Sequence, residues 1–190
     1  IGISNHEVNQ LLLNGGYGSK KEIHFIPSGF GKIFPQLKDI KFNYCKLTVL
    51  ARKNFKKMNH VEWIYLSHNE INQIDEETFY EVPKLKFLHI DDNRLASLPI
   101  NLFIKNSNLQ TLDLNSNFIQ QIDGQIFRNN PQLQYLHLKN NKLTKIDIKL
   151  SAHSNLLMAH FKNNICINAD YNRGGQSLQN FQNLIDGNCK

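Results

Sequence analysis

A period of 24 residues runs through most of the chain. Apolar residues recur at positions 1, 4 and 6 of each copy, and an asparagine or a cysteine follows at position 9. Successive copies start at Leu37, Val61, Leu85, Leu109 and Leu133, and a sixth starts at Leu156 after 23 residues. A unit this short cannot bury its apolar face alone, so units repeated at this interval have to stack on one another. The period therefore predicts a solenoid and excludes most globular folds.

The spacing within each copy predicts how the units stack. Apolar residues three and then two positions apart form a short strand, whose inward side chains lie about 4.8 Å from those of the next strand. An amide at position 9 can satisfy the buried backbone groups of the turn that follows. These amides belong to Asn69, Asn93, Asn117, Asn141 and Asn164. Cys45 holds the same position in the first copy, and we interpret it as a small buried thiol and not as a nucleophile.

A phenylalanine recurs 18 residues after the start of four copies, and this predicts a stack of rings in the wide half of the coil. The rings belong to Phe55, Phe79, Phe103 and Phe127. The equivalent residue after Leu133 is Ser151, so we expect the stack to end there.

The segments LKFLHIDDNRL at 85–95, LQTLDLNSNFI at 109–119 and LQYLHLKNNKL at 133–143 resemble the leucine-rich repeat family, whose signature is L-x-x-L-x-L-x-x-N-x-L. The resemblance covers residues from about 20 to 165. It implies an α/β solenoid, a horseshoe with a parallel β-sheet on its concave side, an irregular convex side and a small helical cap at the carboxy terminus.

We expect three regions: atypical strands and a turn over residues 1–36, the repeats over 37–165, and a disulfide cap over 166–190. In the first region, a compressed copy can be traced through Ile23, Phe25, Phe30 and Ile33. A further strand can be traced through Val8, Leu11 and Leu13.

In the last region, one face of a predicted helix carries Leu178, Phe181, Leu184 and Ile185. With Cys166 and Cys189, this segment resembles the cysteine-bearing cap of extracellular leucine-rich repeat proteins in a single-bridge form, which implies a Cys166–Cys189 disulfide. Residues 164–168 and the opening of the chain also resemble small secreted repeat proteins of dipteran insects. A disulfide indicates a secreted or luminal protein. The alternative is a pair of reduced cysteines in a cytosolic protein.

Charge and hydropathy narrow the class of partner only slightly. The net charge of +6 favours anionic partners in general. The densest basic run, residues 52–57, is either an anion-binding surface around Lys53, Lys56 and Lys57 or an ordinary solvated face. No stretch approaches the roughly 20 apolar residues of a membrane helix, so we expect a soluble chain without a membrane span. Because the sequence begins at Ile1 without a signal peptide, we expect a processed protein or a trimmed piece of a longer one.

Positions 3, 5, 7 and 8 of each copy are expected to project from the open face of the sheet. Several of them carry large aromatic residues where the fold does not require apolar side chains, and exposed aromatic clusters mark contact surfaces. Mixed with histidine and aspartate, they suit a protein or peptide better than the phosphates of a nucleic acid. The predicted partner-binding residues are Trp63, Tyr65, Phe87, His89, Asp91, Asp113, Tyr135 and His137. The alternative is that these rings stiffen the sheet or are covered by the terminal segments.

Metal binding and catalysis find little support in the sequence. His89, Asp113, His137 and His160 share one column, but alternate strands lie nearly 10 Å apart, whereas zinc ligands lie about 2 Å from the ion. His137 could converge with His160 or with Asp113, but all four side chains could not. We therefore expect no metal and no cofactor, although a column of histidines also permits a pH-sensitive face. The glycine-rich run 15–20 lacks the ending of a phosphate-binding loop, and we interpret it as a turn. The sequence predicts that the chain is not an enzyme.

These observations together predict a secreted recognition module that binds a protein or peptide through the concave face, in immunity or adhesion, and that does not bind nucleic acid. Two alternatives stay open. The chain could be a structural repeat protein that associates with itself, or it could be the ectodomain fragment of a longer receptor.

Overall fold

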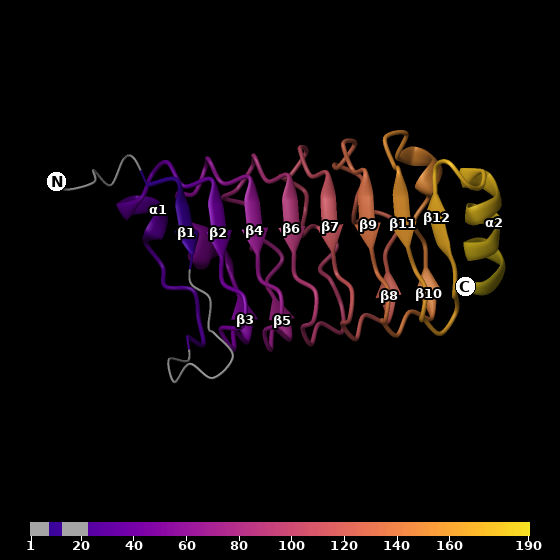
Figure 1. Cartoon of the computed structure of the whole chain (residues 1–190), viewed down its shortest axis with the longest axis horizontal. Helices are drawn as coiled ribbons and strands as arrows, with labels where there is room; N and C mark the ends of the chain where they lie inside the picture. Colours follow the sequence, from indigo (N-terminus) through magenta and orange to yellow (C-terminus); the bar gives the residue numbers. More distant parts are fainter. Residues whose placement is uncertain (1–7, 13–22) are drawn as a thin grey trace.

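In the computed structural model, which describes residues 8–12 and 23–190, the chain coils into one elongated array of stacked turns (Figure 1). Eight short strands form a single sheet in the order β1-β2-β4-β6-β7-β9-β11-β12. Their bounds are β1 Gln10–Leu12, β2 Asp39–Lys41, β4 Trp63–Tyr65, β6 Phe87–His89, β7 Thr111–Asp113, β9 Tyr135–His137, β11 Met158–His160 and β12 Asp170–Asn172. The predicted solenoid with a parallel sheet is confirmed.

The register of the sheet follows the period of the sequence. Trp63 lies opposite Phe87, Phe87 opposite Thr111, and Thr111 opposite Tyr135, each pair in parallel strands. Residues 24 apart in sequence are therefore neighbours on one face. Among the described strands of this sheet, β12 in the cap is the one that pairs antiparallel, with its neighbour β11.

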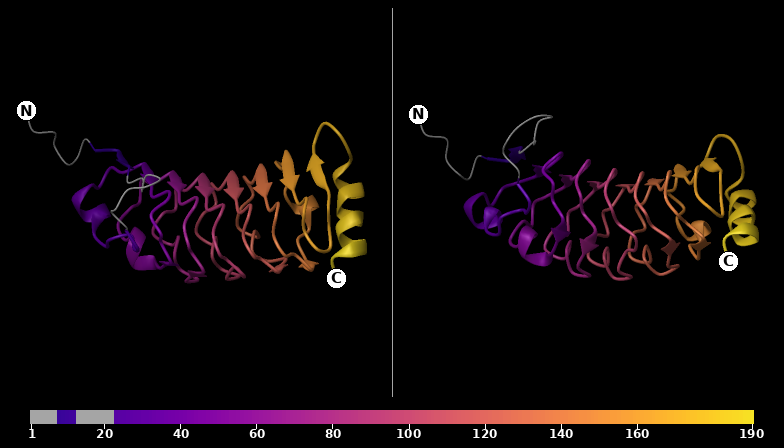
Figure 2. Two further views of the ribbon diagram at one scale, coloured as in Figure 1. Left: turned by 60° about the horizontal axis from the view of Figure 1, so that its bottom comes forward. Right: turned by 90° about the horizontal axis from the view of Figure 1, so that it is seen from below.

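The opposite side of the coil is less regular, as expected. It carries two-residue strands in two small parallel sheets, in which β3 Val49–Leu50 pairs with β5 Gln73–Ile74 and β8 Gln121–Ile122 pairs with β10 Lys145–Ile146. Two 3₁₀ turns, Arg52–Phe55 and Leu150–Ala152, belong to the same side. Figure 2 shows the large sheet along one side of the coil and these short strands along the other.

The space between the two sides is filled by the predicted apolar layers. The central residue of every repeat strand is buried, as are the four repeating phenylalanines. Phe79 and Phe103 stack with ring centroids 6.0 Å apart, and Phe103 and Phe127 at the same distance, so the ring stack is confirmed. Beyond it, Ser151 is exposed, and the buried ring of His153 meets Phe127 edge-on at 6.3 Å.

A ladder of asparagine side chains runs along the coil where the strands end. Asn93 shows the pattern: its Oδ1 accepts a hydrogen bond from Ile71 N at 2.9 Å, and its Nδ2 donates to the carbonyls of Leu66 and Ile90 at 2.9 and 3.1 Å. The residue just before each ladder position is left-handed, with φ from 51° to 60°. These residues are Tyr44, His68, Asp92, Ser116, Asn140 and Asn163. The left-handed residue lies three positions beyond the end of the strand and directly precedes the inward side chain of the ladder. Cys45 is buried and free of any disulfide, as expected, and its Sγ donates to Asn43 O.

The amino-terminal region departs from the predicted copy. Residues Phe30–Ile33 form a short helix, α1, and not a strand. Phe25 and Ile33 are 65% and 50% exposed, so the copy traced through them is wrong. The strand next to β2 in the sheet is instead β1, in which Leu11 lies opposite Ile40. The helix begins after Gly29 at φ 106°, a conformation that suits glycine. Leu13 and the glycine-rich run 15–20 lie outside the described residues.

The carboxy-terminal cap is formed by β12 and by the helix α2, Leu178–Asn188, which covers the last turn (Figure 1). The predicted Cys166–Cys189 disulfide is present. Ile185 is buried as expected, but Leu184 is 40% exposed, so its assignment to the inner face is wrong.

The inward position near Leu184 is taken by the buried side chain of Gln182. Its Oε1 accepts from Leu150 N at 2.8 Å, and its Nε2 donates to Ile148 O at 3.1 Å. The cap helix thus docks through a polar side chain as well as through apolar ones. Within the described residues, none of the helices has the length and apolar character needed to cross a membrane.

Candidate functional site

The open face of the large sheet carries the predicted partner-binding residues in columns. Trp63 and Phe87 project from β4 and β6, and their rings stack with centroids 6.0 Å apart and planes 10° apart. Beside them, Tyr65 and His89 stack at 5.2 Å. All four side chains are half-buried. We call these four residues the aromatic cluster. Lys41 places its Nζ 4.8 Å from the centre of the Tyr65 ring at one edge.

A second group of rings lies further along the same face. Tyr135 and His137 project from β9, with ring centroids 6.4 Å apart. His160 on β11 brings its Nδ1 within 2.8 Å of the Nδ1 of His137. Thr111, small and buried, occupies the position between Phe87 and Tyr135. The sheet therefore holds the predicted aromatic residues in two groups and not in one continuous stripe.

The surroundings of the histidine pair favour the neutral form of both rings near pH 7. Burial lowers the pKa of His137 to about 4, and repulsion from His160, His89 and Lys139 acts in the same direction, against a weaker attraction to Asp170. Burial also lowers the pKa of His160, as does Lys139. Two neutral rings can share the short contact because one Nδ1–H donates to the other Nδ1.

Between the two groups lies an acidic region that contains two further predicted residues. Asp113 projects from β7, and Asp91 follows the end of β6 by two residues. Burial raises the pKa of Asp113, and the charge of Asp91 adds to this effect. One ligand atom from each of His89, Asp91 and Asp113 lies within 4.8 Å of the others, and His68, Asp91 and Asp92 form a second such set. Among the described residues, these are the two sets of three or more His, Cys, Asp or Glu side chains whose ligand atoms come this close together.

Sequence reasoning missed the role of Asp170. Its Oδ2 lies 3.3 Å from Lys139 Nζ and 3.4 Å from Lys162 Nζ, at the far end of the face. Burial tends to raise the pKa of Asp170, but the backbone N–H of Lys162 and the ammonium of Lys139 leave it below its ordinary value. Asp170 belongs to β12 in the cap, outside the 24-residue pattern, so the period carries no signal for it.

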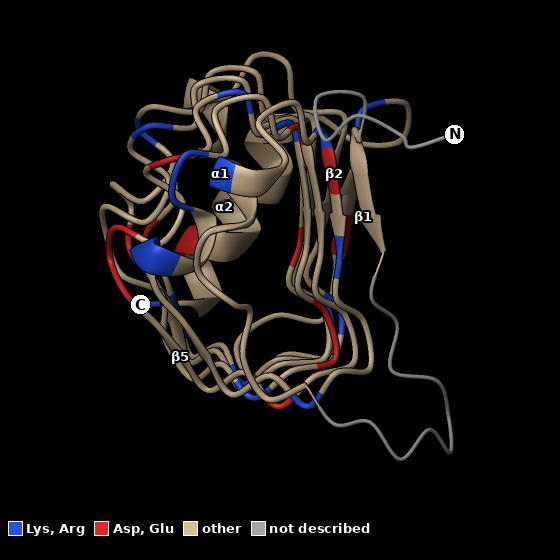
Figure 3. Ribbon diagram, turned by 90° about the vertical axis from the view of Figure 1, so that its left-hand side faces the viewer, with Lys and Arg blue, Asp and Glu red and all other residues tan. Residues whose placement is uncertain are grey.

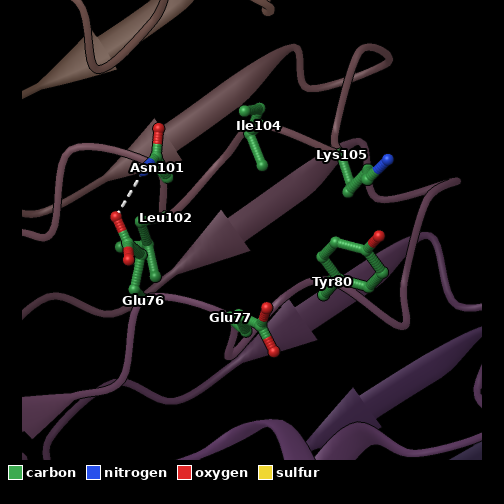
Figure 4. A pocket seen from close by; sticks show the side chains of 7 residues that line it. All are labelled: Glu76, Glu77, Tyr80, Asn101, Leu102, Ile104 and Lys105. Carbon is green, nitrogen blue, oxygen red and sulfur yellow. Dashed lines mark hydrogen bonds between the residues drawn. The ribbon is translucent and has the colours of Figure 1, made fainter.

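Two hollows lie on surfaces away from the large sheet. On the convex side, a hollow of about 250 Å³ lies between two turns and is lined by Glu76, Glu77, Tyr80, Asn101, Leu102, Ile104 and Lys105 (Figure 4). Its one aromatic ring, Tyr80, is flanked by Arg52 at 4.5 Å and Lys105 at 5.0 Å. The hollow thus offers a single aromatic ring, which already contacts two cations. The open face of the sheet offers several aromatic rings.

The basic run forms the second surface. Lys32 from α1 joins Lys53, Lys56 and Lys57 around a hollow of about 400 Å³. In the end-on view of Figure 3, Asp and Glu residues as well as Lys and Arg residues lie around the coil.

Comparison with known proteins agrees with this architecture. The family described as leucine rich repeat matches residues 35–95 and 107–164. No curated protein matches the chain.

Among solved structures, the mosquito LRIM1/APL1C complex matches with 26% identity and a TM-score of 0.69, over 74% of this chain and 26% of that one. The APL1 leucine-rich repeat domain matches with 25% identity and a TM-score of 0.72, over 77% of this chain and 38% of that one. The Drosophila Toll–Spatzle complex, 16% identical with a TM-score of 0.56 over 84% of this chain and 27% of that one, shows the shared fold alone. The chain thus spans well under half the length of the proteins it matches, and its resemblance to dipteran repeat proteins is confirmed.

Proposed function

The chain belongs to the leucine-rich repeat family, and from that premise we propose that it is a secreted, non-catalytic recognition module that binds a protein partner through its concave face. The partner-binding residues are those of the aromatic cluster together with Asp91, Asp113, Tyr135 and His137.

The observation that carries the proposal is the placement of the aromatic cluster. The sheet packs its other face against the core, so the fold needs no apolar side chains on this one. Trp63 and Phe87 nevertheless lie half-buried on adjacent strands, with their rings stacked in nearly parallel planes. Flat, partly preorganised rings of this kind contribute most of the binding energy in protein interfaces, because they bury much apolar area and lose little conformational entropy.

The charges around the cluster favour a protein partner of mixed polarity. Acidic side chains lie on one side of the rings, at Asp91 and Asp113, and the basic residues Lys139 and Lys162 lie near the far end of the sheet. A nucleic acid would require a continuous basic track. Charges of both signs across one face favour a complementary protein surface.

The secreted setting is supported by the Cys166–Cys189 disulfide, because such bonds persist in oxidising compartments. The structures that resemble the chain include the LRIM1/APL1C complex and the Toll–Spatzle complex, the latter described as a hub in development and innate immunity. By analogy, a role in immunity is the first to test, and adhesion is the second.

The test compares capture of partners on three immobilised forms of the protein: wild type, the concave variant Trp63→Ala/Phe87→Ala, and the control Tyr80→Ala/Phe118→Ala. The control removes two exposed aromatic rings that lie outside the large sheet. Extracellular fluid of the source organism supplies the partners. Loss of a central aromatic anchor costs about 2 kcal/mol or more, so each concave substitution should weaken affinity by about 30-fold or more. Equal capture by the wild type and the concave variant would refute the concave-face proposal.

The two alternatives predict different results. A self-assembling repeat protein would grow in mass with concentration in light scattering, whereas a recognition module that acts alone would stay monomeric. A receptor ectodomain would be encoded by a transcript that continues past Lys190 into a membrane-spanning segment.

A further inference from the structure

A mixed cluster of imidazole and carboxylate groups lies on the open face between the ends of β6 and β7. His89 is the last residue of β6, Asp113 is the last residue of β7, and Asp91 follows His89 by two positions. The three residues come from adjacent turns of the coil, and one nitrogen or oxygen ligand atom from each lies within 4.8 Å of the other two.

The two carboxylates of this cluster are oriented by hydrogen bonds from outside it. Asp113 Oδ1 accepts from Asn115 N at 2.9 Å, and Asp91 Oδ1 accepts from Ser67 Oγ at 2.6 Å. Each carboxylate therefore keeps its second oxygen available. The ring of His89 is held against Tyr65. Supporting contacts that fix ligand orientation in this way are typical of metal sites.

In the part of the chain that the structure describes, the negative charge around this cluster is not balanced by ion pairs with lysine or arginine. Asp91, Asp92 and Asp113 lie together, and among the described residues no lysine or arginine forms an ion pair with any of them. The chain as a whole carries a net charge of +6, so this local excess of negative charge stands against the overall balance. Buried or half-buried carboxylates without cationic partners are stabilised by a bound cation.

We propose that His89, Asp91 and Asp113 form a binding site for a divalent transition-metal ion of the zinc type. One imidazole and two carboxylates are a ligand set that zinc accepts at about 2.0–2.2 Å, whereas calcium takes six to eight oxygen ligands. Ligand atoms bound tetrahedrally at that distance lie about 3.4 Å apart, so atoms now within 4.8 Å of one another have to close by no more than about 1.4 Å. Three protein ligands leave at least one position for water or for a group from a partner.

The neighbouring set of His68, Asp91 and Asp92 is the weaker candidate. Both His68 and Asp92 are exposed, and their side chains already contact each other at 3.4 Å, whereas all three members of the proposed site are half-buried. Asp91 belongs to both sets, so the two histidines distinguish them. The His137–His160 pair is a third place where zinc could bind, and it has to be controlled separately.

The test is calorimetric titration of zinc into the untagged, chelator-stripped full chain and into five variants. We expect the wild type to bind one zinc ion per chain at the proposed site. His89→Ala and Asp113→Asn should each weaken zinc binding by more than about tenfold, because even supporting residues of a metal site change affinity by 10- to 100-fold. Asp91→Asn should have the same effect. His68→Ala and His160→Ala should bind zinc as the wild type does.

Cobalt provides a second readout, because the visible spectrum of bound Co²⁺ reports its ligands. That spectrum should be lost in His89→Ala and kept in His68→Ala. Asp113→Asn preserves the side-chain shape and the acceptor for Asn115 N, so an unchanged thermal midpoint would show that its loss of binding is not caused by unfolding. Absence of zinc binding by the wild type, or loss of binding in His68→Ala or His160→Ala with His89→Ala unchanged, would overturn the proposal. Neither result depends on the identity of a protein partner.

Discussion

Replacement of Asn117 by alanine tests how the coil is held together. Asn117 Oδ1 accepts from the buried Leu95 N at 3.0 Å, and its Nδ2 donates to Ile90 O, Leu114 O and Asn115 O at 3.1 to 3.2 Å. The two carbonyls of Ile90 and Leu114 also accept from the ladder asparagines of the neighbouring turns, so they keep a donor in the variant. The alanine variant therefore leaves one buried N–H, that of Leu95, without its partner.

The magnitude follows from these contacts. A buried donor without a partner costs about 1–3 kcal/mol, and the lost bonds from Nδ2 add about 1 kcal/mol. We expect Asn117→Ala to lower the free energy of unfolding by about 3 kcal/mol. For a chain of this length, that corresponds to a fall of about 6–12 °C in the thermal midpoint. Circular dichroism during heating measures it.

Two further variants show whether the destabilisation comes from the buried hydrogen bonds of Asn117 or from the loss of an amide side chain in general. Asn108→Ala removes an exposed amide that makes one long contact, 3.4 Å to Pro83 O, and should leave the midpoint almost unchanged. Asn117→Asp keeps the acceptor for Leu95 N but turns an oxygen toward three carbonyls, so at pH 7 it should destabilise the fold at least as much as alanine does. If the thermal midpoint of Asn117→Ala equals that of Asn108→Ala, the hydrogen-bonded ladder is not what stabilises the turns.

Other regions of the coil give further expectations. Cys189→Ser removes a bridge that closes a sequence separation of 23 residues and should cost about 3–4 kcal/mol in denaturant unfolding; a thiol count in denaturant should find one free thiol, that of Cys45, before reduction and three after it. Phe103→Ala opens the ring stack and should cost about 3–5 kcal/mol, and a loss below 1 kcal/mol would contradict the packing. Because the pKa of His137 is lowered to about 4 in the folded state, the unfolded chain binds more protons below about pH 6.5. Stability measured in chelator should therefore fall as the pH drops from about 6.5 toward 4, and less steeply in His137→Gln; an identical pH profile for the two proteins would exclude His137 as the cause.

The period of the sequence was sufficient to predict the sheet, because every turn repeats the same short strand with the same inward-facing positions. Trp63 and Phe87 could be placed side by side from their 24-residue spacing alone, since register in a parallel stack follows the period. Residues that break the period could not be placed in this way. Helix α1 depends on a left-handed glycine, and the inward position of Gln182 depends on free backbone groups of the turn at Leu150.

The acidic cluster shows a second limit of sequence reasoning. The distance between alternate strands was the basis for the prediction that His89, Asp113, His137 and His160 do not all bind one metal ion. That argument followed one column, whereas Asp91 enters from another column and bridges adjacent turns. Whether side chains in different columns converge depends on their rotamers and on hydrogen bonds such as that from Ser67, which no spacing rule contains.

Trp63 offers the most direct test of the claim that a partner covers the concave face, because it is the only tryptophan in the chain. Protein labelled with 5-fluorotryptophan gives one fluorine resonance from this position, whatever tryptophans the partner contains. On saturation with a captured partner, the account predicts that this resonance shifts and loses its sensitivity to exchange of water for D₂O. A resonance that keeps its position and its solvent sensitivity while the partner is fully bound would contradict the account.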